Sequence, residues 1–175
     1  PASVGAEGEG EGEGEGEGEG EGEGEGEGEG EGEGEGEPAM MWFVDAASTS
    51  GAPDGASWGT AYQTLQQVIA AASVYSDVGR HEVWVAAGVY DEPRDPATGA
   101  LFLQPGVHLY GGFSGSETTL DERDWENNVT TIDGSAARNG MAAYHVIVGA
   151  DDTTLDGFVI TGGQAYGPNE HGYGG

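Results

Sequence analysis

The sequence predicts a solenoid of short parallel strands, a parallel β-helix, preceded by an acidic spacer. Three observations support this prediction. The pentapeptide TTIDG at residues 130–134 returns as TTLDG at residues 153–157. Short apolar segments broken by Gly, Asp and Asn fill the chain after Gly79. Several of these segments recur at a common step of about 23 residues, and such a period is typical of a solenoid in which each repeat forms one coil.

The spacer is a strict alternation of Glu and Gly over residues 7–37, without an apolar residue. Glycine gains nothing from a pleated sheet and loses the most entropy on ordering. Successive Glu side chains, roughly 7 Å apart in an extended chain, repel one another within a Debye length of about 8 Å. We therefore expect residues 1–37 to be a disordered acidic spacer and residues 38–175 to form the folded domain.

The composition excludes several classes of function. The formal net charge is −29, and outside the Glu-Gly run 17 acidic residues and 4 Arg still leave −13. Lysine is absent, so a nucleic acid or an anionic membrane surface is not an expected partner, because both require basic side chains. Cysteine is absent, which excludes disulfides and thiolate metal sites. No window approaches 18 apolar residues, so no transmembrane segment is expected.

One helix is expected after a first strand at residues 40–48. Thr64 and Gln67 fit a capping box at its start, Thr60 and Gln63 offer an alternative start, and the helix should end near Tyr75. We expect this helix to cover the open end of the solenoid with its apolar face. The apolar positions with helical spacing are Leu65, Val68, Ile69 and Ala72.

The remaining segments predict short strands, which stack with a common period in about four coils. Expected strands cover residues 82–90, 101–104, 106–113, 129–133, 144–148 and 153–161. An aliphatic column, predicted to point inward, contains Val85, Leu109, Ile132 and Leu155. A β-branched column contains Val83, Val107, Thr130 and Thr153. A column of the smallest residues, where a Cβ would collide with the next coil, contains Ala87, Gly111, Gly134 and Gly157.

The ordered set of motifs resembles a known family. The segments SWGTAYQTLQQVIAAA, EVWVAAGVY, GVHLYGGFSGSETTLDERDWENNVTTIDG and TTLDGFVITGG are similar to the N-terminal part of right-handed parallel β-helix repeat proteins of the pectate-lyase-like superfamily, of the secreted or surface-anchored bacterial type. The resemblance covers residues 41–175 and is not specific for any activity. It implies an extracellular or cell-surface location and further β-helix coils C-terminal to the fragment.

The expected function is non-catalytic, and no catalytic residue is predicted. The resemblance favours adhesion, structural display or the binding of a polysaccharide or cell-surface glycan. The alternative is the N-terminal part of a polysaccharide lyase or glycoside hydrolase whose catalytic coils lie beyond residue 175. A third interpretation is that the chain only supports and seals the solenoid.

Asp133 and Asp156 are the candidate metal ligands. They occupy the same place in the two related pentapeptides, so a coil spacing of about 4.8 Å would bring their carboxylates together. Such a pair could share a Ca²⁺ ion, or act as acid and base. The alternative is structural, because an Asp-Gly pair commonly makes a turn.

Trp84, His108 and Tyr110 are the candidate glycan contacts, because inward-pointing neighbours turn Trp84 outward. The alternative is that Trp84 is covered by a loop or by the entering strand around Trp42 and Phe43. The charged segment at residues 121–126 is expected to be a latch with Arg123 facing a carboxylate such as Glu117, and otherwise a sugar or metal site.

Overall fold

A computed structural model of the chain describes residues 39–75 and 79–165. These residues all belong to one structural unit, Glu35–Gly175, and the following description concerns that unit. The predicted disordered spacer lies outside the described residues. Within the part of the chain that is described, no helix is long and apolar enough to cross a membrane.

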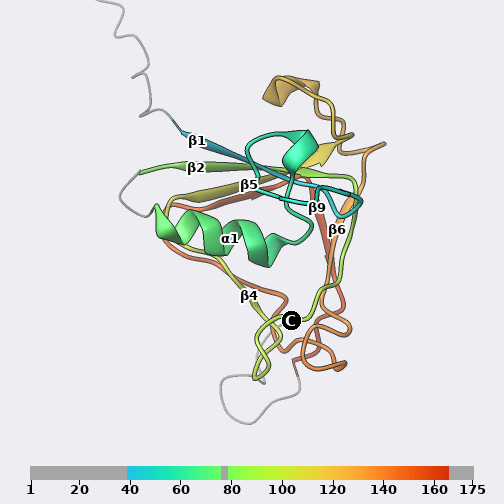
Figure 1. Cartoon of the computed structure of the whole chain (residues 1–175). Helices are drawn as coiled ribbons and strands as arrows, with labels where there is room; N and C mark the ends of the chain where they lie inside the picture. Colours follow the sequence, from blue (N-terminus) through green and yellow to red (C-terminus); the bar gives the residue numbers. More distant parts are fainter. Residues whose placement is uncertain (1–38, 76–78, 166–175) are drawn as a thin grey trace, which may run out of the picture. The chain divides into compact units, whose positions relative to one another are not determined.

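The strands form three parallel sheets (Figure 1). The largest contains, in spatial order, β1 (Met40–Val44), β2 (His81–Ala86), β5 (Val107–Phe113) and β8 (Thr154–Asp156). The second contains β3 (Gly88–Tyr90), β6 (Thr130–Asp133) and β9 (Phe158–Thr161). The third pairs β4 (Leu101–Phe102) with β7 (Ile147–Val148). Every strand segment expected from the sequence therefore contains a strand, and residues 82–90 and 153–161 each contain two.

The predicted right-handed parallel β-helix is wrong. The described strands divide into three open sheets of four, three and two strands, and no sheet closes or forms a solenoid. The error lies in the register. Leu109 pairs with Val83 and with Leu155 in the four-stranded sheet, whereas Ile132 pairs with Tyr90 in the three-stranded sheet. The step from Leu109 to Ile132 thus carries the chain from the four-stranded to the three-stranded sheet, and the step from Ile132 to Leu155 returns it.

The start, cap and buried face of the helix agree with the prediction, whereas its expected role of covering a solenoid end is wrong because no solenoid forms. Helix α1 spans Leu65–Val74, and Thr64 is its N-cap. The Thr64 hydroxyl accepts a hydrogen bond from the backbone N–H of Gln67, while the Gln67 side chain accepts one from the backbone N–H of Thr64, so the capping box is confirmed. The alternative start is not used, because Thr60 ends a short 3₁₀ helix, η1 (Trp58–Thr60). The buried face consists of the four predicted residues, Leu65, Val68, Ile69 and Ala72.

A single apolar core lies between α1 and the sheets. Figure 1 shows α1 alongside the four-stranded sheet, with β4 on the other side of the helix in this view. Val85, Leu109 and Ile132 are fully buried in this core, and Leu155 packs against it. The prediction that these aliphatic residues point inward is therefore confirmed, although they do not form one column.

Two members of the predicted small-residue column do meet. A Cβ added to Gly111 would lie 2.5 Å from the Gly157 carbonyl oxygen, and one added to Gly157 would lie 2.7 Å from that of Gly111. Gly157 also has a φ of +78°, which favours glycine. It separates β8 from β9, so the chain changes sheet at this residue.

Candidate functional site

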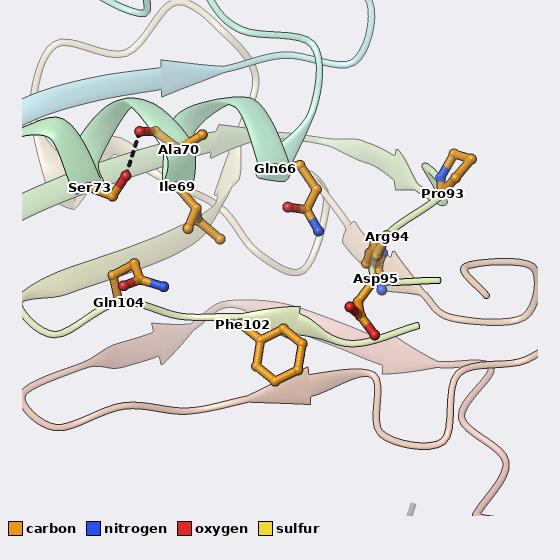
Figure 2. Close-up of a pocket in the computed structure, with 9 residues that line it drawn as sticks. All are labelled: Gln66, Ile69, Ala70, Ser73, Pro93, Arg94, Asp95, Phe102 and Gln104. Carbon is orange, nitrogen blue, oxygen red and sulfur yellow. Dashed lines mark hydrogen bonds between the residues drawn. The ribbon is translucent and has the colours of Figure 1, made fainter. Parts of the chain in front are cut away.

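A pocket lies between α1 and the segment around β4, and we call it the α1–β4 pocket (Figure 2). Its volume is about 540 Å³, which is within the range of small-molecule sites. Figure 2 shows side chains from the helix on one side and from residues 102–104 on the other. The lining residues are Gln66, Ile69, Ala70, Ser73, Pro93, Arg94, Asp95, Phe102 and Gln104.

Two local patterns build the walls of this pocket. Along α1, Leu65, Val68 and Ala72 enter the core, which leaves Gln66 and Ser73 on the side of the helix that borders the pocket. In the segment LFLQ, side chains alternate between the two faces of an extended chain. Leu101 and Leu103 are buried, whereas Phe102 is 43% exposed and turns, with Gln104, towards the pocket. The pocket is thus lined both by Phe102 and by polar and apolar residues of the helix.

The pocket offers several unused hydrogen-bonding groups. Within the described part of the chain, the carboxamides of Gln66 and Gln104 have no hydrogen-bond partner. Ser73 Oγ donates to the carbonyl oxygen of Ala70 at 2.8 Å (Figure 2), so its lone pairs stay available. These groups can both donate and accept, as a ligand rich in hydroxyl groups requires.

Asp95 supplies the carboxylate of the pocket. Its Oδ1 accepts hydrogen bonds from the Thr98 hydroxyl at 2.8 Å and from the Thr98 and Ala97 backbone N–H groups at 2.7 and 3.1 Å. The Thr98 hydroxyl and N–H lower the pKa of Asp95 below its ordinary value. The carboxylate is therefore ionised at neutral pH, and Oδ2 has no partner among the described residues.

Arg94 lies at the end of the pocket but is turned into the protein, with 7% of the residue exposed. Its Nη2 donates to the carbonyl oxygens of Tyr90 at 2.7 Å and Asp133 at 3.1 Å. Nε and Nη1 are shielded from solvent and have no hydrogen-bond partner among the residues that the structure describes. Burial lowers the pKa of Arg94, yet a guanidinium remains charged in proteins. The two carbonyl contacts join the ends of β3 and β6.

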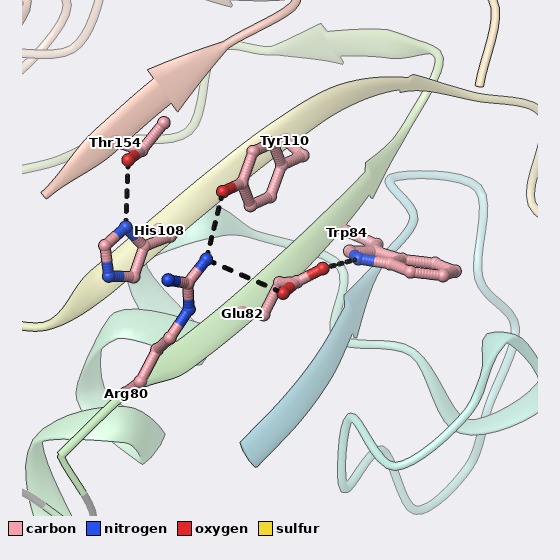
Figure 3. A network of polar contacts seen from close by, with 6 residues as sticks. All are labelled: Arg80, Glu82, Trp84, His108, Tyr110 and Thr154. Atoms are coloured by element: carbon pink, nitrogen blue, oxygen red, sulfur yellow. Dashed lines mark hydrogen bonds and ion pairs between the residues drawn. The ribbon is translucent and has the colours of Figure 1, made fainter. Parts of the chain in front are cut away.

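A second polar cluster lies on the outer face of the four-stranded sheet (Figure 3). Trp84 Nε1 donates to Glu82 at 2.8 Å, and Arg80 contacts both Glu82 at 4.0 Å and the Tyr110 hydroxyl at 3.4 Å. His108 Nδ1 lies 2.9 Å from the Thr154 hydroxyl. Burial, and then the positive charge of Arg80, lower the pKa of His108, so its imidazole is neutral at pH 7.

The candidate glycan contacts lie in this cluster, but their faces are occupied by protein. Trp84 is 5% exposed, with Phe113 stacked on its ring at a centroid distance of 4.7 Å and Phe43 against its edge. The prediction that the entering strand covers Trp84 is thus confirmed. His108 is also 5% exposed, and the Arg123 guanidinium lies 5.3 Å from the centroid of the half-buried Tyr110 ring.

The two candidate metal ligands are not brought together by strand pairing. Asp133 is paired with Thr161 in the three-stranded sheet, and Asp156 is paired with Tyr110 in the four-stranded sheet. The Asp133 side chain accepts a hydrogen bond from the backbone N–H of Ser135 at 2.8 Å, as in an Asp-Gly turn. Asp156 forms an ion pair with Arg123. No group of three or more His, Cys, Asp or Glu side chains in residues 39–75 and 79–165 is placed to hold a metal. The shared Ca²⁺ ion stays a prediction.

The pocket residues were not predicted from the sequence. Gln66 lies on a helix and Gln104 in a distant extended segment, and no local pattern relates the two. A partial signal existed in LFLQ, because alternation separates Phe102 and Gln104 from the buried leucines. This alternation identifies an exposed ring, but not the helix that faces it.

Comparison with models of protein families, with curated proteins and with solved structures finds no match. The resemblance to the pectate-lyase-like superfamily therefore stays a prediction. What the α1–β4 pocket can bind has to be inferred from its own side chains.

Proposed function

We propose that this domain binds a glycan in the α1–β4 pocket without cleaving it. The observation that carries the proposal is the combination, in one open pocket, of two free carboxamides with the exposed ring of Phe102. A sugar presents hydroxyl groups around its edge and a face of C–H groups. Carboxamides match the hydroxyl groups because they both donate and accept, and an aromatic ring matches the apolar face.

Binding without cleavage is supported by the titratable groups of the pocket. Retaining and inverting glycosidases generally use two carboxyl groups roughly 5 to 10 Å apart, one of them with a raised pKa so that it acts as an acid. Asp95 is the only carboxylate among the nine lining residues, and its pKa is lowered rather than raised. This chemistry suits a hydrogen-bond acceptor for sugar hydroxyl groups.

The proposal is tested by screening the chain against an array of oligosaccharides and measuring the affinity for those that bind. Phe102→Ala should weaken binding about twofold to tenfold, because an aromatic contact contributes about 0.5 to 1.5 kcal/mol. Gln104→Ala should weaken it about twofold to tenfold through the loss of a hydrogen bond. Incubation with the bound oligosaccharide should leave its length unchanged.

Val159→Ala is the matched control, because Val159 is 50% exposed but lies on β9, outside the pocket. It should bind like the unmodified chain. The proposal is wrong if no oligosaccharide binds, or if Phe102→Ala and Gln104→Ala both bind as tightly as this control.

A further inference from the structure

We infer that the ligand of the α1–β4 pocket is a neutral glycan, and that glycans bearing carboxylate groups are excluded from it. This inference rests on the proposed function and adds the charge class of the ligand. It follows from the contacts that the charged side chains at the pocket make, and from which of these side chains a ligand could reach.

The pocket presents no cationic hydrogen-bond donor to a ligand. Arg94 is the only basic residue in its lining. Both protons of Arg94 Nη2 are directed to the Tyr90 and Asp133 carbonyl oxygens, and Nε and Nη1 are shielded from solvent. A carboxylate in the pocket could therefore not accept a hydrogen bond from a guanidinium N–H. Proteins generally recognise carboxylates through such charge-assisted hydrogen bonds.

The other three Arg residues are engaged elsewhere. Arg80 contacts Glu82 and Tyr110 on the outer face of the four-stranded sheet. Arg123 pairs with Asp156, and the Arg138 guanidinium lies 3.7 Å from the centroid of the Tyr144 ring. None of these three lines the α1–β4 pocket, and the sequence contains no Lys.

Apart from the buried Arg94, the charge in the pocket and around it is negative. Asp95 is ionised, with Oδ2 unpartnered among the described residues. The net charge is −13 for residues 38–175 and −29 for the whole chain. A negative electrostatic field repels an acidic ligand as it approaches the protein. Once the ligand is bound, repulsion between its carboxylate and that of Asp95 lowers the affinity. A neutral sugar meets no such penalty, and its hydroxyl groups can donate to Asp95 and to the carboxamides.

The experiment compares matched probes: neutral glucan, mannan and galactan oligomers, and the same oligomers with C6 oxidised to a carboxylate. Affinities are measured with the full chain at about 10 and about 300 mM salt. We expect each bound neutral oligomer to bind at least about tenfold more tightly than its oxidised form at low salt. The difference should shrink at high salt, where the Debye length falls below about 10 Å.

Asp95→Asn should reduce the preference for the neutral form at low salt at least about threefold, because it removes the nearest negative charge. Asp121→Asn is the control, because it makes the same change of charge at an exposed residue outside the pocket. This variant should keep most of the preference for the neutral oligomer. Asp95→Asn removes part of a turn, so circular dichroism must first show that it folds. The salt dependence of the unmodified chain tests the inference without any variant.

Each outcome is decisive. Oxidised oligomers that bind as tightly as the neutral ones, or more tightly, overturn this inference and leave glycan binding intact. A preference for neutral oligomers that does not change with salt also overturns it, because the preference would then not be electrostatic. If no oligomer of either kind binds, the proposed function fails, and this inference fails with it.

Discussion

Arg123 donates a hydrogen bond from Nη2 to the Asp156 carboxylate, and this ion pair joins the loop after η2 (Leu120–Glu122) to strand β8. The Arg123 guanidinium also lies 5.3 Å from the centroids of both the Tyr110 and Trp125 rings. The segment at residues 121–126 is thus attached to the sheet, as predicted for a latch. Arg123 faces a carboxylate, as predicted, but it is Asp156 and not Glu117, which instead accepts hydrogen bonds from backbone N–H groups of its own loop.

We predict that Arg123→Ala destabilises the domain more than Asp156→Ala. The Arg variant loses the ion pair and two cation–π contacts and should lower the free energy of unfolding by about 1 to 3 kcal/mol. The Asp variant loses only an ion pair whose carboxylate side chain is 51% exposed, and should cost less than about 1 kcal/mol. Urea unfolding of both variants measures the difference. Equal losses would show that the ring contacts contribute nothing.

The capping box of α1 should be a measurable source of stability. Thr64→Ala removes the acceptor for the Gln67 N–H and should lower the free energy of unfolding by about 1 kcal/mol. Gln63→Ala is a control, because its side chain donates to the Ser48 carbonyl oxygen instead of capping the helix. Helical circular dichroism and thermal melting should separate the two, since only Thr64→Ala is expected to fray the first turn. An unchanged melting temperature in Thr64→Ala would contradict the prediction.

Glu117 should make stability depend on pH between about 4.5 and 2. Burial alone would raise the pKa of Glu117, but N–H groups of Ser114 and Ser116 and the Ser114 hydroxyl together outweigh burial and lower the pKa to about 2. A lowered folded-state pKa gives stability that is present above the ordinary value of 4.5 and is lost as the pH falls towards 2.

The Glu117→Gln variant tests this directly. At pH 7 it should be less stable than the unmodified chain by about 1 kcal/mol, because solvent screening reduces the full linkage effect. The difference should shrink steadily as the pH falls towards 2, where Glu117 is itself about half protonated. Denaturant unfolding at pH 7, 4 and 2 measures the trend, and a difference that stays constant over this range would refute it.

Gly157→Ala should be among the most damaging small substitutions in the domain. The added Cβ would lie 2.7 Å from the Gly111 carbonyl oxygen, and the backbone φ is +78°. Strain of about 1 to 3 kcal/mol is expected from the conformation alone, and the contact adds to it. Gly115→Ala separates the two effects, since its φ is +97° but nothing lies within 4 Å of the added Cβ. Thermal unfolding should show a clearly larger loss for Gly157→Ala than for Gly115→Ala.

Much of the fold was predictable wherever the signal was local. Thr64 and Gln67 are near neighbours in the sequence, so the cap of α1 could be read from the chain, and helical spacing identified the buried face. The location of the strands followed from short apolar segments between turns. The site was less predictable. Trp84 and His108 were correctly placed on the outer face of the sheet, and Phe43 was named as a cover for Trp84, but the stacking of Phe113 on Trp84 was not predicted.

By itself, the sequence determined the helix and its cap and the inward position of Val85, Leu109 and Ile132. Only the tertiary structure decided which strands are neighbours. The sequence repeat identifies equivalent side chains, but backbone hydrogen bonds between distant segments decide that Leu109 pairs with Leu155 and not with Ile132. The α1–β4 pocket was decided in the same way, because Gln66 and Phe102 come to line it together only when helix and strand pack on a common core.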